Sequence, residues 1–378
     1  MNTLITRSEQ SNIYGLTALV QDKSIFNHDI MNCTNDEVQG NFLYSGRALG
    51  LTEPGDILQL HPELESQWSY ITRHYDTVGL SYTHSVVWNT DYGLFTRYQD
   101  YRPSFFYYGE DIFSHYANYD FHNVVDLVNS KNNFMAIAQE LGLPVPQTFC
   151  YDNRSLINDT SIFPYPCYLK AAISVSGVGI YRCEDESELF TALNTFDDGT
   201  PIQIQEEVCA LSFLNVQYIV TRTGVKRFST TEQLLEGFAH RGNRHPSRFN
   251  CWHTTDAYAK YLYDRGISGV FAFDVAVIEK DDKLDYCLIE CNPRFNGATY
   301  PTWIAKKLGV ENWSAEAFST SCRGLDQLNL SGIEYDPVIG GGVVLVNWGP
   351  ILLGKISVLL IGSAAQQAVL REELLKRL

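Results

Sequence analysis

Short runs of apolar residues separated by polar turns predict a chain that mixes helices and strands. Apolar residues recur at helical spacing over Asn129–Leu141, where Ser130 is placed to cap the first turn and Gly142-Leu143-Pro144 ends the helix. Further helices are predicted over Ser187–Leu193 and, with an amphipathic pattern, over Ala364–Leu378. Buried strands are predicted at Cys167–Ala171, Ile202–Gln205, Phe213–Arg222, Val270–Ile278 and Leu284–Ile289, the last two as a hairpin around Lys280–Lys283.

The pattern is weaker toward the N-terminus and in one polar segment. Asp56–Leu60 and Thr77–Leu80 are interpreted as strands or strand edges, and the polar stretch His240–Pro246 as a loop. Tyr98–Tyr108 is rich in Tyr and Phe, which favours a surface or interface segment and makes it the candidate for a homodimer contact.

One long apolar segment, Val338–Ala365, has the length of a membrane span. Asn347, Pro350, Gly354 and Lys355 interrupt it, and a bilayer would have to hide the lysine and the freed backbone groups. We therefore predict two buried strands, Gly342–Asn347 and Ile356–Ile361, joined by a turn, and no membrane partner.

Composition narrows the class of protein. With 378 residues the chain is expected to hold two or three structural units, and its net charge of −16 argues against nucleic acid as a partner. Nine cysteines lack metal-ligand spacing and are expected to be reduced thiols, while the N-terminus lacks the apolar stretch of a signal peptide. These features predict a cytoplasmic protein.

The most informative polar residues lie at the ends of the predicted hairpin strands. Asp274 ends one apolar run, and Glu290 and Asn292 follow the next one at alternate positions, so that the two should face the same side. Two carboxylates and an amide oxygen suit Mg²⁺, and Arg294 continues the alternation as a cation for a transferring phosphoryl group. The alternative is a hairpin whose acids are merely solvated.

Two lysines complement these acids. Lys131 opens the predicted helix, and Lys170 ends a strand just before the Ser/Gly-rich loop Ser174–Gly179, whose backbone N–H groups and small side chains suit phosphate. The loop matches neither the P-loop nor the dinucleotide fingerprint, and a flexible hairpin tip is an equal alternative. The strand end Ile204–Val208 can offer polar atoms to an adenine edge, or be an ordinary charged strand end.

A local basic stretch, Lys226–Arg244, stands out in this acidic chain. Arginine binds carboxylates through paired donors, so Arg241 and Arg244 are candidates for holding a substrate carboxylate. The alternative is surface charge paired with nearby acids, which contributes little to stability.

In this order, these motifs resemble those of the ATP-grasp superfamily over about residues 128–301. The resemblance rests on Ser130-Lys131 with Leu143-Pro144-Val145-Pro146, on Tyr168-Leu169-Lys170 with the Ser/Gly loop, on Gln205-Glu206-Glu207-Val208, on Asp274, and on Glu290-x-Asn292-x-Arg294 followed by Asn296-Gly297. The flanks, Pro54-Gly55-Asp56-Ile57, His240-x-Gly242-Asn243-x-x-Pro246 and the tail from Gly341, resemble carboxylate–amine and peptide ligases with a pre-ATP-grasp domain. The family's usual adenine-side acid is Gln205 here, and Ser212 or Asn215 falls near its ribose-binding acid.

The resemblance implies an α/β and α+β architecture, the ATP-grasp fold with an N-terminal Rossmann-like pre-ATP-grasp domain. It implies a Rossmann-like domain over 1–127, a subdomain with a glycine-rich lid loop over 128–204, and a C-terminal subdomain with metal and catalytic residues over 205–378. The implied nucleotide-binding residues are Lys131, Lys170, Ser176, Gly177, Gly179, Gln205, Glu206 and Val208. The implied metal ligands are Asp274, Glu290 and Asn292, the catalytic residues Arg294 and Lys170, and the substrate-binding residues Arg241, Arg244 and Asn296.

The implied activity is that of a carbon–nitrogen ligase that uses ATP with Mg²⁺ or Mn²⁺ to join a small-molecule carboxylate to an amine, such as an amino acid or peptide. An acyl phosphate would be the intermediate, with release of ADP and phosphate. Two alternatives stay open. One is an ATP-grasp enzyme with another acceptor, which carboxylates or phosphorylates its substrate, and the other is a non-catalytic nucleotide-binding protein.

Overall fold

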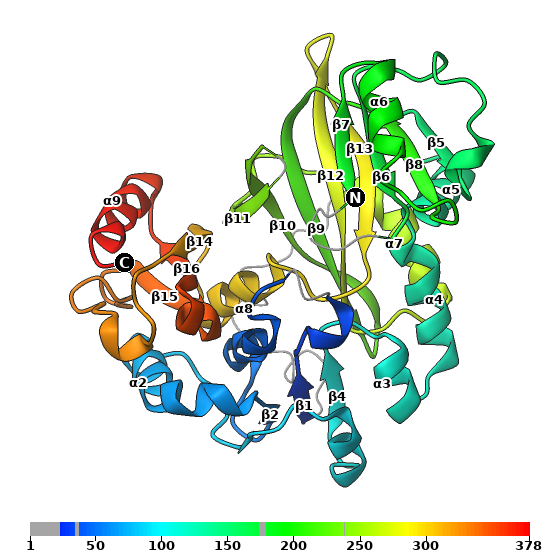
Figure 1. Cartoon of the computed structure of the whole chain (residues 1–378). Helices are drawn as coiled ribbons and strands as arrows, with labels where there is room; N and C mark the ends of the chain where they lie inside the picture. Colours follow the sequence, from blue (N-terminus) through cyan, green and yellow to red (C-terminus); the bar gives the residue numbers. More distant parts are fainter. Residues whose placement is uncertain (1–22, 35–37, 174–178, 238) are drawn as a thin grey trace, which may run out of the picture. The chain divides into compact units, whose positions relative to one another are not determined.

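The computed structural model of the chain describes residues 23–34, 38–173, 179–237 and 239–378. The chain divides into two compact units, each made of separate chain segments (Figure 1). Unit 1 comprises Met1–Ala117, Arg241–Pro246 and Phe295–Leu378, and unit 2 comprises Asn118–His240 and Ser247–Arg294. The three-part division expected from the sequence, with boundaries at 127/128 and 204/205, stays a prediction.

Unit 1 contains a four-stranded parallel sheet with the order β3-β2-β1-β4. Parallel neighbours need crossover connections, and helical segments provide them here. The strands are β1 (Ser24–Asn27), β2 (Ile57–Gln59), β3 (Val86–Val87) and β4 (Arg102–Phe105). The connecting helical segments are η1 (Met31–Cys33), η2 (Asn41–Leu51), η3 (Pro62–Gln67), α2 (Trp68–Val78) and η4 (Tyr92–Arg97), and α3 (Glu110–His115) follows β4. This sheet confirms the Rossmann-like N-terminal region, with β2 at the predicted strand Asp56–Leu60.

The strand predicted at Thr77–Leu80 is wrong, because α2 continues to Val78. Gly79, at φ +72°, ends the helix in a conformation that favours glycine. Ile71, Tyr75 and Val78 are buried at helical spacing, and the strand prediction missed this period because it considered only the last few residues.

The remaining strands of unit 1 are antiparallel in the order β11-β14-β16-β15. β15 (Gly342–Asn347) and β16 (Lys355–Ile361) are joined by η7 (Gly349–Leu353), which confirms the two strands predicted within Val338–Ala365. The other elements are β11 (Ala239–His245), α8 (Thr299–Leu308), β14 (Trp313–Ser319), η6 (Leu325–Gln327) and α9 (Ala364–Leu375). Within the described parts of the chain, no helix has both the length and the apolar character that crossing a bilayer requires.

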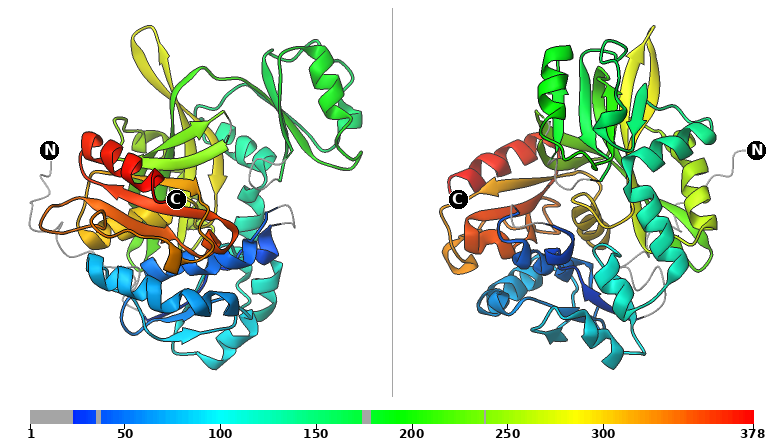
Figure 2. Two further views of the ribbon diagram at one scale, coloured as in Figure 1. Left: turned by 60° about the vertical axis from the view of Figure 1, so that its left-hand side comes forward. Right: turned by 45° about the vertical axis from the view of Figure 1, so that its right-hand side comes forward.

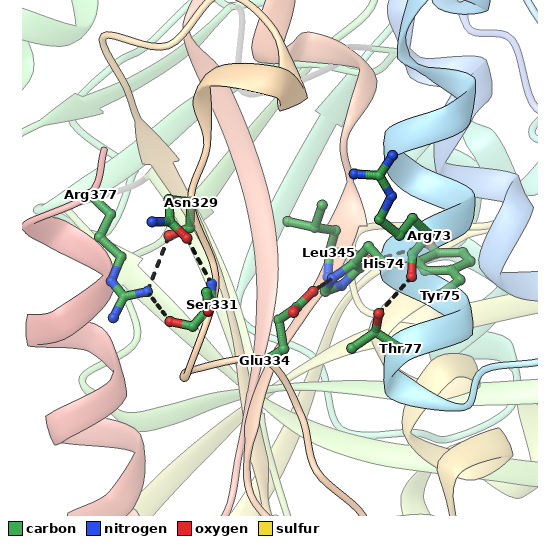
Figure 3. A network of polar contacts seen from close by, with 9 residues as sticks. All are labelled: Arg73, His74, Tyr75, Thr77, Asn329, Ser331, Glu334, Leu345 and Arg377. Carbon is green, nitrogen blue, oxygen red and sulfur yellow. Dashed lines mark hydrogen bonds and ion pairs between the residues drawn. The ribbon is translucent and has the colours of Figure 1, made fainter.

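A polar network ties α2 to the C-terminal segments of the same unit (Figure 3). The buried His74 ring contacts Glu334 Oε1 through Nδ1 at 2.6 Å, and the backbone N–H of Leu345 donates to its Nε2 at 3.0 Å. Nε2 therefore acts as an acceptor, and Nδ1 carries the proton that Glu334 accepts.

A second set of contacts in the same view involves the last residues of the chain. Arg377 Nη1 donates to the carbonyls of Asn329 and Ser331 at 3.1 and 2.8 Å, which holds the end of the chain in place.

Unit 2 contains two antiparallel sheets, with strand orders β13-β12-β9-β10 and β5-β8-β6-β7. Helix α6 packs on β6 and β7 of the smaller sheet (Figure 2). The elements are α4 (Tyr119–Asn129), α5 (Lys131–Glu140), β5 (Thr148–Tyr151), η5 (Arg154–Leu156), β6 (Cys167–Ala171), β7 (Ile180–Cys183), α6 (Glu186–Leu193), β8 (Ile202–Glu206), β9 (Ala210–Thr221), β10 (Gly224–Glu236), α7 (Trp252–Asp264), β12 (Val270–Lys280) and β13 (Lys283–Asn292).

Most sequence predictions for unit 2 are confirmed. Ser130 caps α5 by accepting the N–H of Asn133, and Phe134 of that helix stacks on Tyr258 with ring centroids 5.0 Å apart. β12 and β13 form the predicted hairpin. Its two-residue turn places Asp281 and Asp282 at φ 51° and 57°, a left-handed conformation that aspartate tolerates better than most residues.

Candidate functional site

The candidate metal ligands lie side by side on the hairpin of unit 2. Asp274 of β12 and Glu290 of β13 are direct cross-strand partners, and the register shifts by one residue immediately after Asp274. A bulge of this kind re-aims side chains, and Asn292 remains on the same face as Glu290 because it lies two residues further along β13. The predicted convergence of these three side chains is therefore a feature of the structure.

Three side-chain amides donate to the Asp274 carboxyl group. Asn215 Nδ2 of β9 and Gln233 Nε2 of β10 contact Oδ1 at 2.8 and 2.7 Å, and Asn292 Nδ2 contacts Oδ2 at 3.1 Å. Burial and the adjacent Glu290 nevertheless raise the pKa of Asp274 to about 7. Two neighbouring carboxyl groups resist being ionised at the same time unless a cation binds between them.

Glu290 lies among cations. Lys131 Nζ is 3.4 Å from Glu290 Oε2. Burial opposes ionisation of this carboxyl group, but Lys131, Lys170 and Arg294 outweigh that effect and lower its pKa. Glu290 is thus held as a carboxylate, and its side chain keeps 31% of its surface exposed, so a ligand can reach it.

The donor chemistry of this site fits a hard divalent cation. Mg²⁺ prefers one or two carboxylates, with waters and phosphate oxygens completing its shell. Asp274 and Glu290 provide two carboxylates, Asn292 an amide oxygen, and Asn215 Oδ1 is buried without a hydrogen-bond partner among the described residues. Within the described residues, no group of three or more His, Cys, Asp or Glu side chains is placed to hold a metal ion.

The two lysines are brought together by the end of β6. The backbone N–H of Lys131 donates to the carbonyl of Ala172 at 2.7 Å, which places the start of α5 beside the residue pair that follows Lys170. Lys170 is buried, and its Nζ donates to Gln205 Oε1 at 2.7 Å. Burial and the neighbouring Lys131 lower the pKa of Lys170 to about 8, although Glu290 opposes them. Two cations this close favour a ligand with several negative charges.

The predicted nucleotide-binding strand is β8 and the residues after it. Gln205 is buried, with Nε2 donating to Thr148 Oγ1 at 3.0 Å, so its amide positions Lys170 rather than pointing outward. The N–H of Gln147 donates to Glu206 Oε1, and the carbonyl of Val208 accepts the N–H of Ala210. Ser176 and Gly177 lie outside the described residues, and Gly179 adopts φ +73° at the start of the next strand.

No protein-family model and no curated protein sequence matches the chain. Solved structures do match it over nearly its whole length. N5-carboxyaminoimidazole synthetase from Staphylococcus aureus, solved with ADP, is 11% identical with a TM-score of 0.57, covering 97% of this chain and 99% of that chain. Biotin carboxylase from Campylobacter jejuni is 13% identical with a TM-score of 0.60, covering 94% and 91%. N5-carboxyaminoimidazole ribonucleotide synthetase from Thermus thermophilus is 14% identical with a TM-score of 0.51, covering 94% and 96%.

These neighbours share the ATP-grasp fold with an N-terminal domain. The chain has the ATP-grasp fold. At such low sequence identity the likeness establishes the architecture and leaves the chemistry to be argued from this chain's residues.

The predicted catalytic arginine lies in unit 2, and the predicted substrate residues lie in unit 1. Arg294 belongs to unit 2, where its Nη1 lies 3.5 Å from Asn129 Oδ1. Arg241, Arg244 and Asn296 belong to unit 1. Both arginines are exposed, and the Asn296 backbone N–H donates to Thr299 Oγ1 at the start of α8.

The loop predicted over His240–Pro246 is wrong, because these residues form most of β11. Gly242 pairs with Glu316 of β14, and a Cβ at Gly242 would stand 1.8 Å from the carbonyl oxygen of Ala315. The strand thus depends on glycine at a close approach of two strands and on a partner distant in sequence. Local polarity does not reveal either condition.

Two polar residues of the candidate site were not among the predicted metal or catalytic residues. Gln233 and Asn215 orient Asp274 through their amide groups. Both stand at positions of long β-prone runs where a buried amide is unusual, and that was the available signal. Their partner could not be predicted, because β9 and β12 meet only through the register of the folded sheet.

Proposed function

We propose that the protein is an ATP-dependent ligase that activates a carboxylate as an acyl phosphate and transfers the acyl group to an amine. The observation that supports this most is the convergence of Asp274, Glu290 and Asn292 with Lys131 and Lys170 in unit 2. Glu290 lies next to another carboxyl group and next to lysines. A metal–nucleotide complex would neutralise both sets, because the metal ion carries positive charge and the phosphates carry negative charge.

Each residue has a role in the proposed reaction. Asp274, Glu290 and Asn292 would hold Mg²⁺ or Mn²⁺, which supplies neutralising charge for phosphate oxygens when bound. Lys131 and Lys170 would bind phosphate oxygens, with Gly179 alongside, and the stretch from Gln205 to Val208 would lie along the adenine. Arg294, which lowers the pKa of Glu290, would stabilise the transferring phosphoryl group.

The chemistry has two steps. An oxygen of the substrate carboxylate attacks the γ-phosphorus, and the bond to the β,γ-bridging oxygen breaks to release ADP. The amine nitrogen then attacks the acyl carbon, loses a proton, and displaces phosphate to leave an amide. Arg241, Arg244 and Asn296 are candidates for holding the substrates. Holding the reactants in the correct geometry can lower the activation barrier of such reactions by roughly 7–11 kcal/mol.

A carboxylating version of the same chemistry is the second candidate. Two of the solved structures with this fold are named as carboxyaminoimidazole synthetases and one as a biotin carboxylase. If bicarbonate takes the place of the substrate carboxylate, the first step gives carboxyphosphate and the second gives an N-carboxylated amine. The residues required are the same, so the structure of unit 2 alone does not separate the two versions.

Substrate screening separates these proposals. ADP release is measured with Mg²⁺ over a panel of amino acids and small carboxylates, in CO₂-depleted buffer and with added bicarbonate, and products are identified by mass spectrometry. ADP release that requires an organic carboxylate and an amine supports amide formation, and release that requires bicarbonate supports carboxylation. A phosphorylated product would assign a phosphorylating enzyme.

Two controls accompany the screen. Glu290→Gln should abolish turnover, and Glu279→Gln, which removes an exposed acid from the same strand pair, should not change it. Nucleotide binding without ADP release under every condition would contradict the ligase proposal and indicate a non-catalytic nucleotide-binding protein.

A further inference from the structure

Unit 1 contains a buried arginine held between aromatic rings. Arg47 lies in η2, after β1, and only 7% of its surface is exposed. Its guanidinium carbon stands 4.2 Å from the ring centroid of Phe106, 4.5 Å from that of Tyr300 and 5.3 Å from that of Tyr44. Aromatic faces attract a cation and compensate part of the loss of hydration on burial.

The rings do not satisfy the hydrogen-bonding capacity of Arg47. The donors of a guanidinium lie in its plane, so that rings over its faces leave the edges available. Nε and Nη2 are buried, and among the described residues neither has a hydrogen-bond acceptor. No carboxylate of the described chain forms an ion pair with this cation. Buried donors are almost always paired, so two unpaired N–H groups on one buried cation indicate an absent acceptor.

The position of Arg47 matches where ligands bind in parallel sheets. The chain adds β2 and β3 on one side of β1 and then adds β4 on the other side. The topological switch point of the sheet therefore lies between β1 and β4. Ligands in such sheets bind outside the carboxyl ends of the strands at this point. His28 directly follows β1 and Phe106 directly follows β4, and both belong to the group around Arg47.

A second unpaired donor lies in the same neighbourhood. The backbone N–H of Phe295 donates to the carbonyl of Phe106, whose ring covers Arg47. The next residue, Asn296, has its Nδ2 buried without an acceptor among the described residues. Its Oδ1 is engaged by the N–H of Ala298, so the orientation of the amide is set and Nδ2 is left to donate.

Among the described residues, the other ionisable groups nearby do not act as hydrogen-bond acceptors for Nε and Nη2 of Arg47. Burial, assisted by Arg47, holds the pKa of His28 far below its usual value, and its two ring nitrogens contact Tyr300 Oη at 2.9 Å and Ser104 Oγ at 3.0 Å. Burial raises the pKa of Tyr300, so its hydroxyl stays neutral. Asp29 is the nearby acid: burial raises its pKa although the charge of Arg47 opposes this, and its Oδ1 accepts the N–H of Met31.

We propose that Arg47 forms an anion-binding subsite, in which Nε, Nη2 and the Asn296 amide bind a carboxylate or phosphate group of a small molecule at the carboxyl end of the parallel sheet. An acceptor-only group with several lone pairs matches a set of sites that offers donors alone. The inference stands on unit 1 and does not depend on the ligase chemistry proposed for unit 2.

A local spectroscopic measurement tests this proposal on the full chain. The protein is labelled with ¹⁵N-arginine, and the side-chain Nε–H resonance of Arg47 is identified by its loss in Arg47→Lys. Acetate and succinate form one titration series, and inorganic phosphate and ribose 5-phosphate form the other, each against sodium chloride at matched ionic strength. A saturable shift of the Arg47 resonance is expected, and the series that produces it at lower concentration identifies the carboxylate or the phosphate as the group bound.

Matched variants separate a site from general charge attraction. Arg47→Met should weaken binding of the effective anion at least tenfold by calorimetry, and Asn296→Ala should weaken it less. Arg73→Met is the control, because Arg73 is an exposed arginine near the Tyr70 ring in the same unit. If Arg47→Met does not fold, the titration of the parent protein decides alone. An Arg47 resonance that no anion shifts beyond the chloride control, or one that shifts no more than that of Arg73, would overturn the proposal.

Discussion

Asp274 in unit 2 and Arg47 in unit 1 are both ionisable side chains in largely buried surroundings, and their environments are opposite. Asp274 accepts hydrogen bonds from three amides and has a second carboxyl group beside it. Arg47 has aromatic rings over its faces and two donors without acceptors. Asp274 has enough hydrogen-bond donors but a neighbour of the same charge, whereas Arg47 lacks hydrogen-bond acceptors.

The difference teaches how the side chains of a protein indicate what it binds. The carboxyl pair indicates a cation by like-charge repulsion, which shows as the raised pKa of Asp274. The arginine indicates an anion by unsatisfied donors. A third group, Lys307, shows what a purely structural buried cation looks like, because its Nζ donates to the carbonyls of Thr52 and Ser81 at 2.5 and 2.6 Å and lies 3.4 Å from Glu53 Oε1.

The largest expected effect comes from breaking the carboxyl pair. Glu290→Gln keeps the size of the side chain but removes the charge that a cation would neutralise, so we expect turnover to fall by about 10³-fold. The free energy of unfolding should fall modestly, because the cations that lower the pKa of Glu290 lose their carboxylate, and relief of the repulsion on Asp274 offsets only part of that loss. Steady-state ADP release and urea denaturation provide the two values. A variant that keeps full turnover would show that Glu290 is not a metal ligand.

The next effect distinguishes the two buried cations of unit 1. Lys307→Met leaves two carbonyls without their donor and the Glu53 carboxylate without its ion-pair partner, so we expect a loss of about 3 kcal/mol in the free energy of unfolding. Arg47→Met removes ring contacts and an interaction with the neutral Tyr300 hydroxyl, but leaves no carboxylate unpaired, so we expect about 1 kcal/mol or less. Equal losses in urea denaturation would mean that Arg47 is a structural cation like Lys307.

A smaller effect is expected from pH. Without a metal, Asp274 holds a proton below about pH 7, and a divalent cation must displace that proton to bind. The affinity for Mn²⁺ should therefore fall as the pH is lowered below about 7, approaching about tenfold per pH unit, and should level off above it. Titrations followed by electron paramagnetic resonance give the affinities. An affinity that does not change across this range would contradict the raised pKa of Asp274 or its role as a metal ligand.

The smallest expected effect comes from the amides that orient Asp274. Gln233→Leu removes one donor to Oδ1 while Asn215 retains the other, so we expect the Mg²⁺ concentration for half-maximal activity to rise about 10-fold. Gln139→Leu replaces an exposed glutamine of α5 and is the matched control. If Gln233→Leu behaves like the control, the Gln233 amide does not position the metal ligand.

Local patterns predicted unit 2 well because the information there is local. The capped helix at Ser130, the hairpin turn at Asp281-Asp282 and the alternation Glu290, Asn292, Arg294 each depend on residues a few positions apart. A hairpin also brings its own strand ends together, so the pairing of Asp274 with Glu290 follows from the turn.

Features that depend on distant segments were not predictable in this way. β11 exists because Gly242 can approach β14, which lies about seventy residues further along the chain. The group around Arg47 combines residues that follow β1, that follow β4 and that begin α8, and none of them belongs to a motif. Unsatisfied donors are a property of the folded chain and leave no periodic pattern in the sequence.

The most direct test of the proposed metal centre is the location of a bound ion. Crystals grown with ADP and Mn²⁺ can be measured at an X-ray wavelength where manganese scatters anomalously. We predict an anomalous peak about 2.1–2.2 Å from carboxylate oxygens of both Asp274 and Glu290, with Asn292 Oδ1 turned toward it. Manganese bound to the nucleotide with neither carboxylate in its coordination shell would contradict the account.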